Sequence, residues 1–180
     1  KLLGQLQQQI SFMQQHLHLQ VNIAGISNSR KMLLKEDGIN MADWKTELDA
    51  GSTANLQEFV DEIISRNLRN SIFVDVTASD HVAAVYARLL EKSVNVVACN
   101  KVAASSAYSN YKQLKDLARA YNCQFLFETN VGAALPIIAT LNDLVSSGDN
   151  IHRMQAVLSG TLNFVFNNYD GSRPFADVVK

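Results

Sequence analysis

One apolar run, over residues 94–98, constrains the fold of this chain most, because it ends abruptly in Asn100 and Lys101. Short, largely apolar runs rich in β-branched residues are typical of a strand buried on both faces of a parallel sheet. Similar runs cover residues 71–77 and 124–127, and helical patterns separate the three runs. The alternation predicts successive βαβ units, and right-handed crossovers then give an α/β fold with a Rossmann-like, doubly wound parallel sheet.

The spacing of apolar residues predicts the remaining elements. Expected helices cover residues 1–17, 41–48, 56–68, 79–92, 104–122, 136–145 and 161–168. Asn55 is the expected cap of the helix over 56–68, Pro136 belongs to the first turn of its helix, and Ser159 or Thr161 caps the last helix. Two further strands are expected over residues 19–26 and 151–158. We place one domain over residues 1–130 and the start of a second, α+β domain over residues 131–180.

The composition excludes several classes of partner. The net charge is −1 and only 18% of residues are charged, so neither nucleic acid nor an anionic membrane is an expected partner. No apolar run approaches the roughly 18 residues that a membrane-spanning helix needs. Cys99 and Cys123 lie in or beside apolar strand patterns and are expected to be two buried thiols in a reducing compartment, the cytoplasm.

Chemistry is expected where the parallel strands end. In open α/β sheets, ligands bind outside the carboxyl ends of the strands. Asn100 and Lys101 follow one strand, and Thr77 and Ala78 follow another at a junction with a helix, where backbone N–H groups suit an anionic or polar ligand. Lys101 is the principal candidate for catalysis, although an ordinary solvated loop lysine would give the same pattern.

A polar turn, Asn28-Ser29-Arg30, follows the strand expected over residues 19–26. At this place in dinucleotide-binding folds, an acidic residue holds the ribose 2′-hydroxyl of NAD, whereas an arginine accommodates the 2′-phosphate of NADP. The turn has no acid, and a guanidinium matches phosphate geometry. The pattern favours NADP over NAD, and a plain polar turn is the alternative.

A loop of small residues covers residues 128–136 and contains one glycine. Such a loop can turn several backbone carbonyl groups inward and hold Na⁺ or K⁺, by analogy with other oxygen-ligand sites. A tight turn with ordinary helix capping is the alternative.

Several of these segments together resemble homoserine dehydrogenase, in particular the dehydrogenase half of bifunctional aspartokinase–homoserine dehydrogenases. The matching segments are residues 74–79, 100–103, 127–136 and 158–163, with an insert over 38–44 that resembles the bifunctional branch. The resemblance implies an NAD(P)-dependent interconversion of L-aspartate 4-semialdehyde and L-homoserine. It also implies a homo-oligomer, a dimer formed through the second domain.

The resemblance also implies roles for individual residues. By position, the 2′-phosphate end of the cofactor would meet Asn28, Ser29 and Arg30, and the nicotinamide side would meet Thr77, Ala78, Asn100 and Lys101. Backbone oxygens for the monovalent cation would come from Glu128, Val131, Ala133 and Leu135, and the substrate pocket would be bordered by Gly160 and Thr161.

The sequence departs from the family pattern in two places. The family's glycine-rich turn is expected before residue 1, and its acidic segment with a second catalytic lysine after residue 180. We therefore expect that the 180 residues alone do not turn over substrate. A non-catalytic module that serves oligomer assembly or allosteric coupling is the main alternative, and a related semialdehyde or sugar dehydrogenase is a weaker one.

Overall fold

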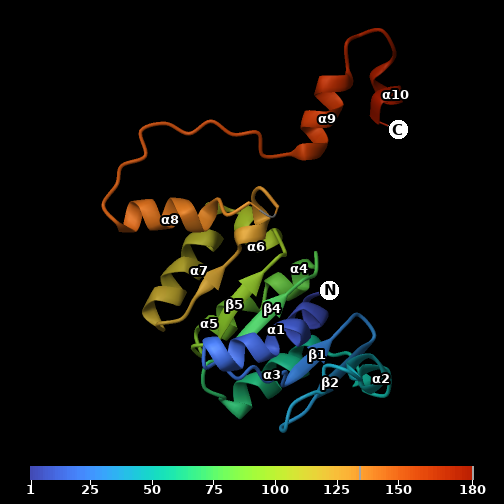
Figure 1. Ribbon diagram of the computed structural model, residues 1–180, viewed down its shortest axis with the longest axis vertical. Helices are drawn as coiled ribbons and strands as arrows, with labels where there is room; N and C mark the ends of the chain where they lie inside the picture. The colour runs from blue at the N-terminus through green and yellow to red at the C-terminus, as the bar shows by residue number, and fades with distance from the viewer. Residues whose placement is uncertain (134, 180) are drawn as a thin grey trace. The chain divides into compact units, whose positions relative to one another are not determined.

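The structure, a computed structural model, describes residues 1–133 and 135–179 and divides into two compact units, Lys1–Arg69 and Asn70–Lys180. The elements of the first unit are α1 (Leu2–His16), β1 (Gly25–Ser27), β2 (Lys31–Leu34), α2 (Trp44–Asp49), β3 (Ser52–Thr53) and α3 (Leu56–Arg66) (Figure 1). β1, β2 and β3 form an antiparallel sheet in that order. Asn55 caps α3 as expected, since its side chain accepts hydrogen bonds from the backbone N–H groups of Gln57 and Glu58.

The second unit begins with the predicted parallel sheet. Its elements are β4 (Ile72–Asp75), α4 (Asp80–Ala83), α5 (Tyr86–Leu90), β5 (Asn95–Ala98), α6 (Val102–Ser105), α7 (Tyr108–Ala120) and β6 (Phe125–Leu126). β5 lies between β4 and β6, and both pairs are parallel. The α/β class with a parallel sheet is therefore confirmed.

The core of this unit lies between the sheet and α5. Tyr86, Leu89 and Leu90 of α5 are fully buried. The Tyr86 ring contacts Phe73 of β4 and Phe125 of β6 at centroid distances of 6.4 and 5.8 Å. This packing fixes the strands of the sheet relative to α5 and so fixes where their carboxyl ends lie.

The unit continues with a 3-10 helix, η1 (Glu128–Asn130), and three helices, α8 (Ile138–Ser146), α9 (Gly160–Asn168) and α10 (Phe175–Val179). Ser159 caps α9, because its hydroxyl accepts a hydrogen bond from the backbone N–H of Leu162. No helix among residues 1–133 and 135–179 is long and apolar enough to cross a membrane.

Two strand predictions need correction. Only the end of the strand expected over residues 19–26 forms, as β1, and it pairs with β2 in an antiparallel hairpin that the sequence patterns did not indicate. The strand expected over residues 151–158 is wrong: this segment is irregular and pairs with no described strand. Its alternating apolar pattern lacks the neighbour that would bind its backbone groups, and Val157 is 76% exposed.

Two helix predictions were too long. The helix expected over 79–92 is divided into α4 and α5, and the helix expected over 104–122 is divided into α6 and α7. At the second break, the Ser106 hydroxyl donates to the Ala103 carbonyl and accepts from the Asn110 side chain. Such local side-chain bonds compete with helical hydrogen bonds.

Two smaller expectations were also wrong. Pro136 precedes α8 by two residues and so lies outside its first turn. Cys99 is exposed and Cys123 is only partly buried, and both are free thiols, so the expected pair of buried thiols is not found.

Candidate functional site

A buried carboxylate, Asp75, organises the carboxyl ends of β4 and β5. Asp75 is the last residue of β4 and only 2% exposed. Its Oδ2 accepts hydrogen bonds from the Tyr86 hydroxyl at 2.5 Å and from Asn100 Nδ2 at 3.0 Å. Its Oδ1 accepts from the backbone N–H of Thr77 at 2.7 Å. All three neighbours donate, so the burial of this acceptor is matched by hydrogen bonds.

Tyr86 anchors this carboxylate to the core. Its side chain is fully buried. Burial, and then the hydrogen bond to Asp75, raise the pKa of the Tyr86 hydroxyl far above its ordinary value. The hydroxyl therefore stays protonated and remains a donor.

Asn100 closes the turn that carries Lys101. Asn100 is 1% exposed. Its Nδ2 also donates to the Ser79 carbonyl at 2.9 Å, and its Oδ1 accepts from the backbone N–H of Val102 at 3.1 Å. The side-chain amide thus closes the turn around Lys101 through Val102 and connects this turn to Ser79.

Three expected ligand-contacting residues lie in exposed turns after the strands. Lys101 lies three residues after the end of β5, at the N-cap of α6, and its side chain is exposed. Thr77 and Ala78 are exposed in the turn after β4. Because Asp75 and Asn100 are bonded to each other and to both turns, the structure brings these three residues to the same edge of the sheet.

The turn expected to bind the 2′-phosphate is the tip of the β1–β2 hairpin. Asn28 Oδ1 accepts from the backbone N–H groups of Arg30 and Lys31, both at 2.8 Å. The side chains of Ser29 and Arg30 are exposed. A guanidinium on a rigid turn is available to an anionic group.

The loop expected to bind a cation begins with Glu128, and its carboxylate has a structural role. Oε1 and Oε2 accept from the backbone N–H groups of Ile138 and Ala139 at 2.9 and 2.7 Å, which caps α8. Gly132 and Ala133 have φ values of +70° and +53°, so the backbone turns sharply at these two residues. All four residues expected to bind the cation lie in the described part of the chain, and Leu135 is exposed.

Asn130, in the same loop, contacts the turn after β5. Its Nδ2 donates to the Asn100 carbonyl at 3.2 Å, and its buried Oδ1 accepts from no described residue. The two residues expected at the substrate pocket, Gly160 and Thr161, are exposed at the start of α9.

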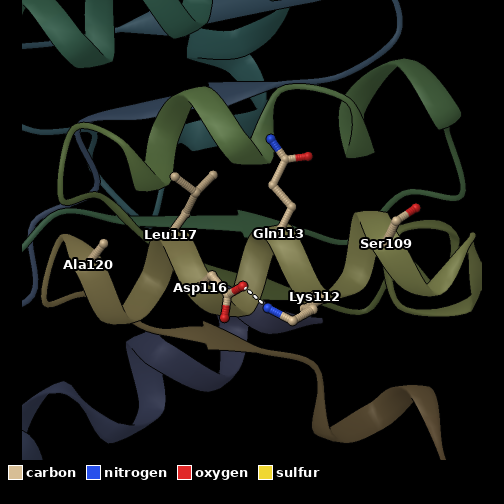
Figure 2. Close-up of a pocket in the computed structure, with 6 residues that line it drawn as sticks. All are labelled: Ser109, Lys112, Gln113, Asp116, Leu117 and Ala120. Atoms are coloured by element: carbon tan, nitrogen blue, oxygen red, sulfur yellow. Dashed lines mark hydrogen bonds and ion pairs between the residues drawn. The ribbon is translucent and has the colours of Figure 1, made fainter.

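A shallow cavity of about 420 Å³ lies elsewhere, along α7. Figure 2 shows its lining residues, all on this one helix: Ser109, Lys112, Gln113, Asp116, Leu117 and Ala120. Lys112 and Asp116 form an ion pair one helical turn apart on α7. None of the lining residues belongs to the turns after β4 or β5, so we do not assign this cavity to the site.

Sequence reasoning missed Asp75, Tyr86 and Asn130. A signal existed for Asp75, because a carboxylate at a buried position of an apolar strand requires partners. No sequence pattern indicated that Tyr86 would supply one of them.

A parallel α/β layer with polar turns at its carboxyl edge places the chain in the class of open α/β proteins, many of which bind nucleotides at this edge. Residues 1–128 match the family model described as homoserine dehydrogenase, NAD binding domain, and residues 136–180 match the model described as homoserine dehydrogenase. The chain belongs to the homoserine dehydrogenase family.

Similar proteins include bifunctional aspartokinases. The chloroplastic bifunctional aspartokinase/homoserine dehydrogenase 1 of Zea mays is 38% identical over 180 residues, which cover 99% of this chain and 20% of that protein. The homoserine dehydrogenase of Schizosaccharomyces pombe is 30% identical over 166 residues, 88% of this chain and 44% of that protein. The chain thus spans about a fifth of the bifunctional relative and under half of the yeast enzyme.

Among solved structures, a hyperthermophilic archaeal homoserine dehydrogenase in complex with NADPH has a TM-score of 0.74 and 24% identity. The match covers 97% of this chain and 55% of that one. This likeness supports the Rossmann-like fold.

Proposed function

We propose that the protein carrying this chain is an NAD(P)-dependent homoserine dehydrogenase that interconverts L-aspartate 4-semialdehyde and L-homoserine, as part of a bifunctional aspartokinase–homoserine dehydrogenase. The observation that carries the proposal is Lys101, exposed in a turn that Asn100 and Asp75 hold at the carboxyl edge of the sheet. Family membership favours this function over a non-catalytic module.

Lys101 is the proposed catalytic residue. Reduction of an aldehyde by hydride leaves an alkoxide that needs a proton or a cation, and a bound nicotinamide supplies the hydride. The Lys101 ammonium donates to this oxygen and stabilises its charge. Thr77 and Ala78 line the nicotinamide side. Asn100 is buried and supports that side through its hydrogen bonds to the turns.

Substitution of Lys101 tests the activity. In the full-length protein, Lys101→Met is expected to lower kcat for NADPH-dependent semialdehyde reduction by about 10²–10⁴-fold, the usual contribution of a positioned acid or base. NADPH binding measured by fluorescence should persist. Lys92→Met, at another exposed lysine of the same unit, is the matched control and should leave kcat unchanged. A Lys101→Met enzyme with normal kcat would refute the assigned role.

We propose that the tip of the β1–β2 hairpin binds the 2′-phosphate and so makes the enzyme prefer NADP. The support for this proposal is the exposed Arg30 and the Asn28-bonded turn, with Ser29 beside them. Arg30→Ala should raise KM for NADPH about tenfold or more, the worth of a charged hydrogen bond, and leave KM for NADH unchanged. Arg69→Ala, also exposed in this unit, is the control. Equal changes for both cofactors would contradict the preference.

We propose that the loop over residues 128–136 holds Na⁺ or K⁺ through backbone oxygens of Glu128, Val131, Ala133 and Leu135. The sharp turn at Gly132 and Ala133 supports this proposal. Activity should rise on titration of NaCl or KCl against choline chloride at constant ionic strength. Equal rates in all three salts would contradict it.

We further propose that residues 1–130 form the NAD(P)-binding domain and residues 131–180 begin the substrate-binding and dimerisation domain, with Gly160 and Thr161 at the substrate. The ranges of the two family models, 1–128 and 136–180, support this division. Exposed apolar side chains in the second region suit an interface in a homodimer: Met154, Val157, Leu158, Leu162, Phe164 and Phe166. Light scattering of the full-length protein measures the oligomer.

Two further proposals concern activity and location. The sequence contains no G-x-G-x-x-G turn to hold a pyrophosphate, so residues 1–180 alone should show no NADP-dependent homoserine oxidation. A clear rate would contradict this.

The proposed location is the cytoplasm, supported by two free thiols, whereas the plant relatives are named chloroplastic. Cell fractionation distinguishes these locations.

A further inference from the structure

We infer that Asp75 is a positioning residue, whose buried carboxylate sets the geometry of both turns that flank the reacting atoms. The inference rests on the proposed dehydrogenase function. Asp75 itself is 2% exposed, so it acts on a ligand only through the groups that it holds.

The first turn is held directly. Asp75 Oδ1 accepts from the Thr77 backbone N–H at 2.7 Å, which closes the turn immediately after β4. An acceptor two residues before a donor is the geometry of an Asx-type turn, which fixes the backbone without help from a neighbouring strand. Thr77 and Ala78 therefore take their places from this carboxylate.

The second turn is held through Asn100. Asp75 Oδ2 and the Ser79 carbonyl accept both N–H groups of the Asn100 amide, at 3.0 and 2.9 Å. This orientation leaves Asn100 Oδ1 to accept from Val102 N at 3.1 Å, across Lys101. The position of the Lys101 backbone thus depends on a carboxylate one strand away.

The connection extends to the loop over residues 128–136. The Asn100 carbonyl accepts from Asn130 Nδ2 at 3.2 Å. Three separate segments, the turns after β4 and β5 and the η1 loop, are therefore joined through Asn100, and Asp75 is the charged group of the network.

Asp75→Asn disrupts this network selectively. The variant keeps the shape of the side chain but replaces one acceptor oxygen with an NH₂ group. Whichever way the new amide turns, its NH₂ faces either the Thr77 N–H or the Asn100 NH₂, and two donors cannot bond. A displacement of about 1 Å at a reacting group lowers rates on the order of 10²-fold.

Asn95, on the neighbouring strand β5, offers a matched control. Its amide also bridges backbone groups of both neighbouring segments, donating to the Ser71 carbonyl and accepting from Gln124 N, each at 3.0 Å. These bonds lie at the amino end of β5, away from Lys101. Asn95→Ser therefore weakens the sheet without touching the turns.

The test uses the full-length protein. For Asp75→Asn we expect kcat to fall about 10²-fold, with KM for NADPH changed much less, while Asn95→Ser keeps normal kcat. Amide hydrogen exchange should accelerate at both Thr77 and Val102 in Asp75→Asn and at neither in Asn95→Ser. Asn100→Ser decides the case if Asp75→Asn does not fold: kcat should fall likewise, and exchange should accelerate at Val102 while Thr77 stays protected.

Two results would overturn the inference. The first is a normal kcat in Asp75→Asn or, if that variant does not fold, in Asn100→Ser. The second is an equal loss of kcat in the test variant and in Asn95→Ser. Absence of dehydrogenase activity in the unsubstituted protein would instead refute the proposed function, and the exchange measurement would still report whether Asp75 holds the two turns.

Discussion

The carboxylate of Glu128 gives a sharp prediction about the start of α8. Its two oxygens accept from the first two backbone N–H groups of this helix, at 2.9 and 2.7 Å. Helix N-termini leave such groups without intrahelical partners, and a negative charge there also interacts favourably with the helix dipole. Removal of the carboxylate should therefore destabilise α8 locally.

The size of the effect follows from the two bonds. Glu128→Gln retains one acceptor oxygen, and water replaces the second bond because Ala139 is exposed, so we expect a cost of about 1 kcal/mol. Glu128→Ala removes both acceptors and the charge, for a cost of about 2 kcal/mol. These values correspond to roughly 5-fold and 30-fold lower protection from exchange.

Amide hydrogen exchange at Ile138 and Ala139, read by mass spectrometry or NMR, measures this directly. Glu91→Gln, at an exposed glutamate in the same unit, is the control and should change protection in α8 by less than twofold. Unchanged protection in both Glu128 variants would show that the carboxylate does not cap α8, and the geometric reasoning would be refuted.

Three further predictions concern the caps, thiols and core. Asn55→Ala should cost α3 about 1 kcal/mol of local stability, seen as about fivefold lower exchange protection of its first turn. Cys99, which is exposed, should be alkylated by iodoacetamide before Cys123, whose pKa is raised by burial; the order is read by peptide mass spectrometry. Because the pKa of Tyr86 is raised in the folded state, its contribution to stability is complete below pH ~10 and declines above it. Between pH 9 and 11, the unfolding temperature should therefore fall less steeply for Tyr86→Phe than for the control Tyr108→Phe.

The sheet could be predicted from sequence because its strands carry their own signal. Four of the five residues over 94–98 are apolar, with Asn95 the exception, and β5 is indeed central, with Val96 fully buried. The place of Lys101 followed from the end of that run. These predictions depend only on the burial of a strand, which the apolar residues of that strand indicate directly.

The hairpin and the irregular segment could not be predicted in the same way. β2 exists because Asn28 closes a turn and β3 returns alongside it, and neither event changes the hydrophobic pattern of residues 31–34. Conversely, residues 151–158 alternate as a strand does but have no described partner. Strand formation depends on a neighbour distant in sequence, which a local pattern cannot report.

The site was predictable only at its surface. Lys101 and Thr77 were predicted as site residues because polar residues follow apolar runs. The interior that supports them, where Tyr86 reaches Asp75 from a different element, depends on the packing of α5 against the sheet. Such a contact arises from tertiary structure and leaves no trace in residue spacing.

The hairpin tip separates two tasks between neighbouring residues. The side chains of Ser27 and Asn28 close the turn through hydrogen bonds to its backbone. Among the described residues, the exposed side chains of Ser29 and Arg30 make no such bond. On the proposal that this tip meets the 2′-phosphate, selection could exchange the residues at positions 29 and 30, and with them the coenzyme used, while the hydrogen bonds of the turn stay intact. The same proposal implies that a change of coenzyme would need substitutions at these two positions only.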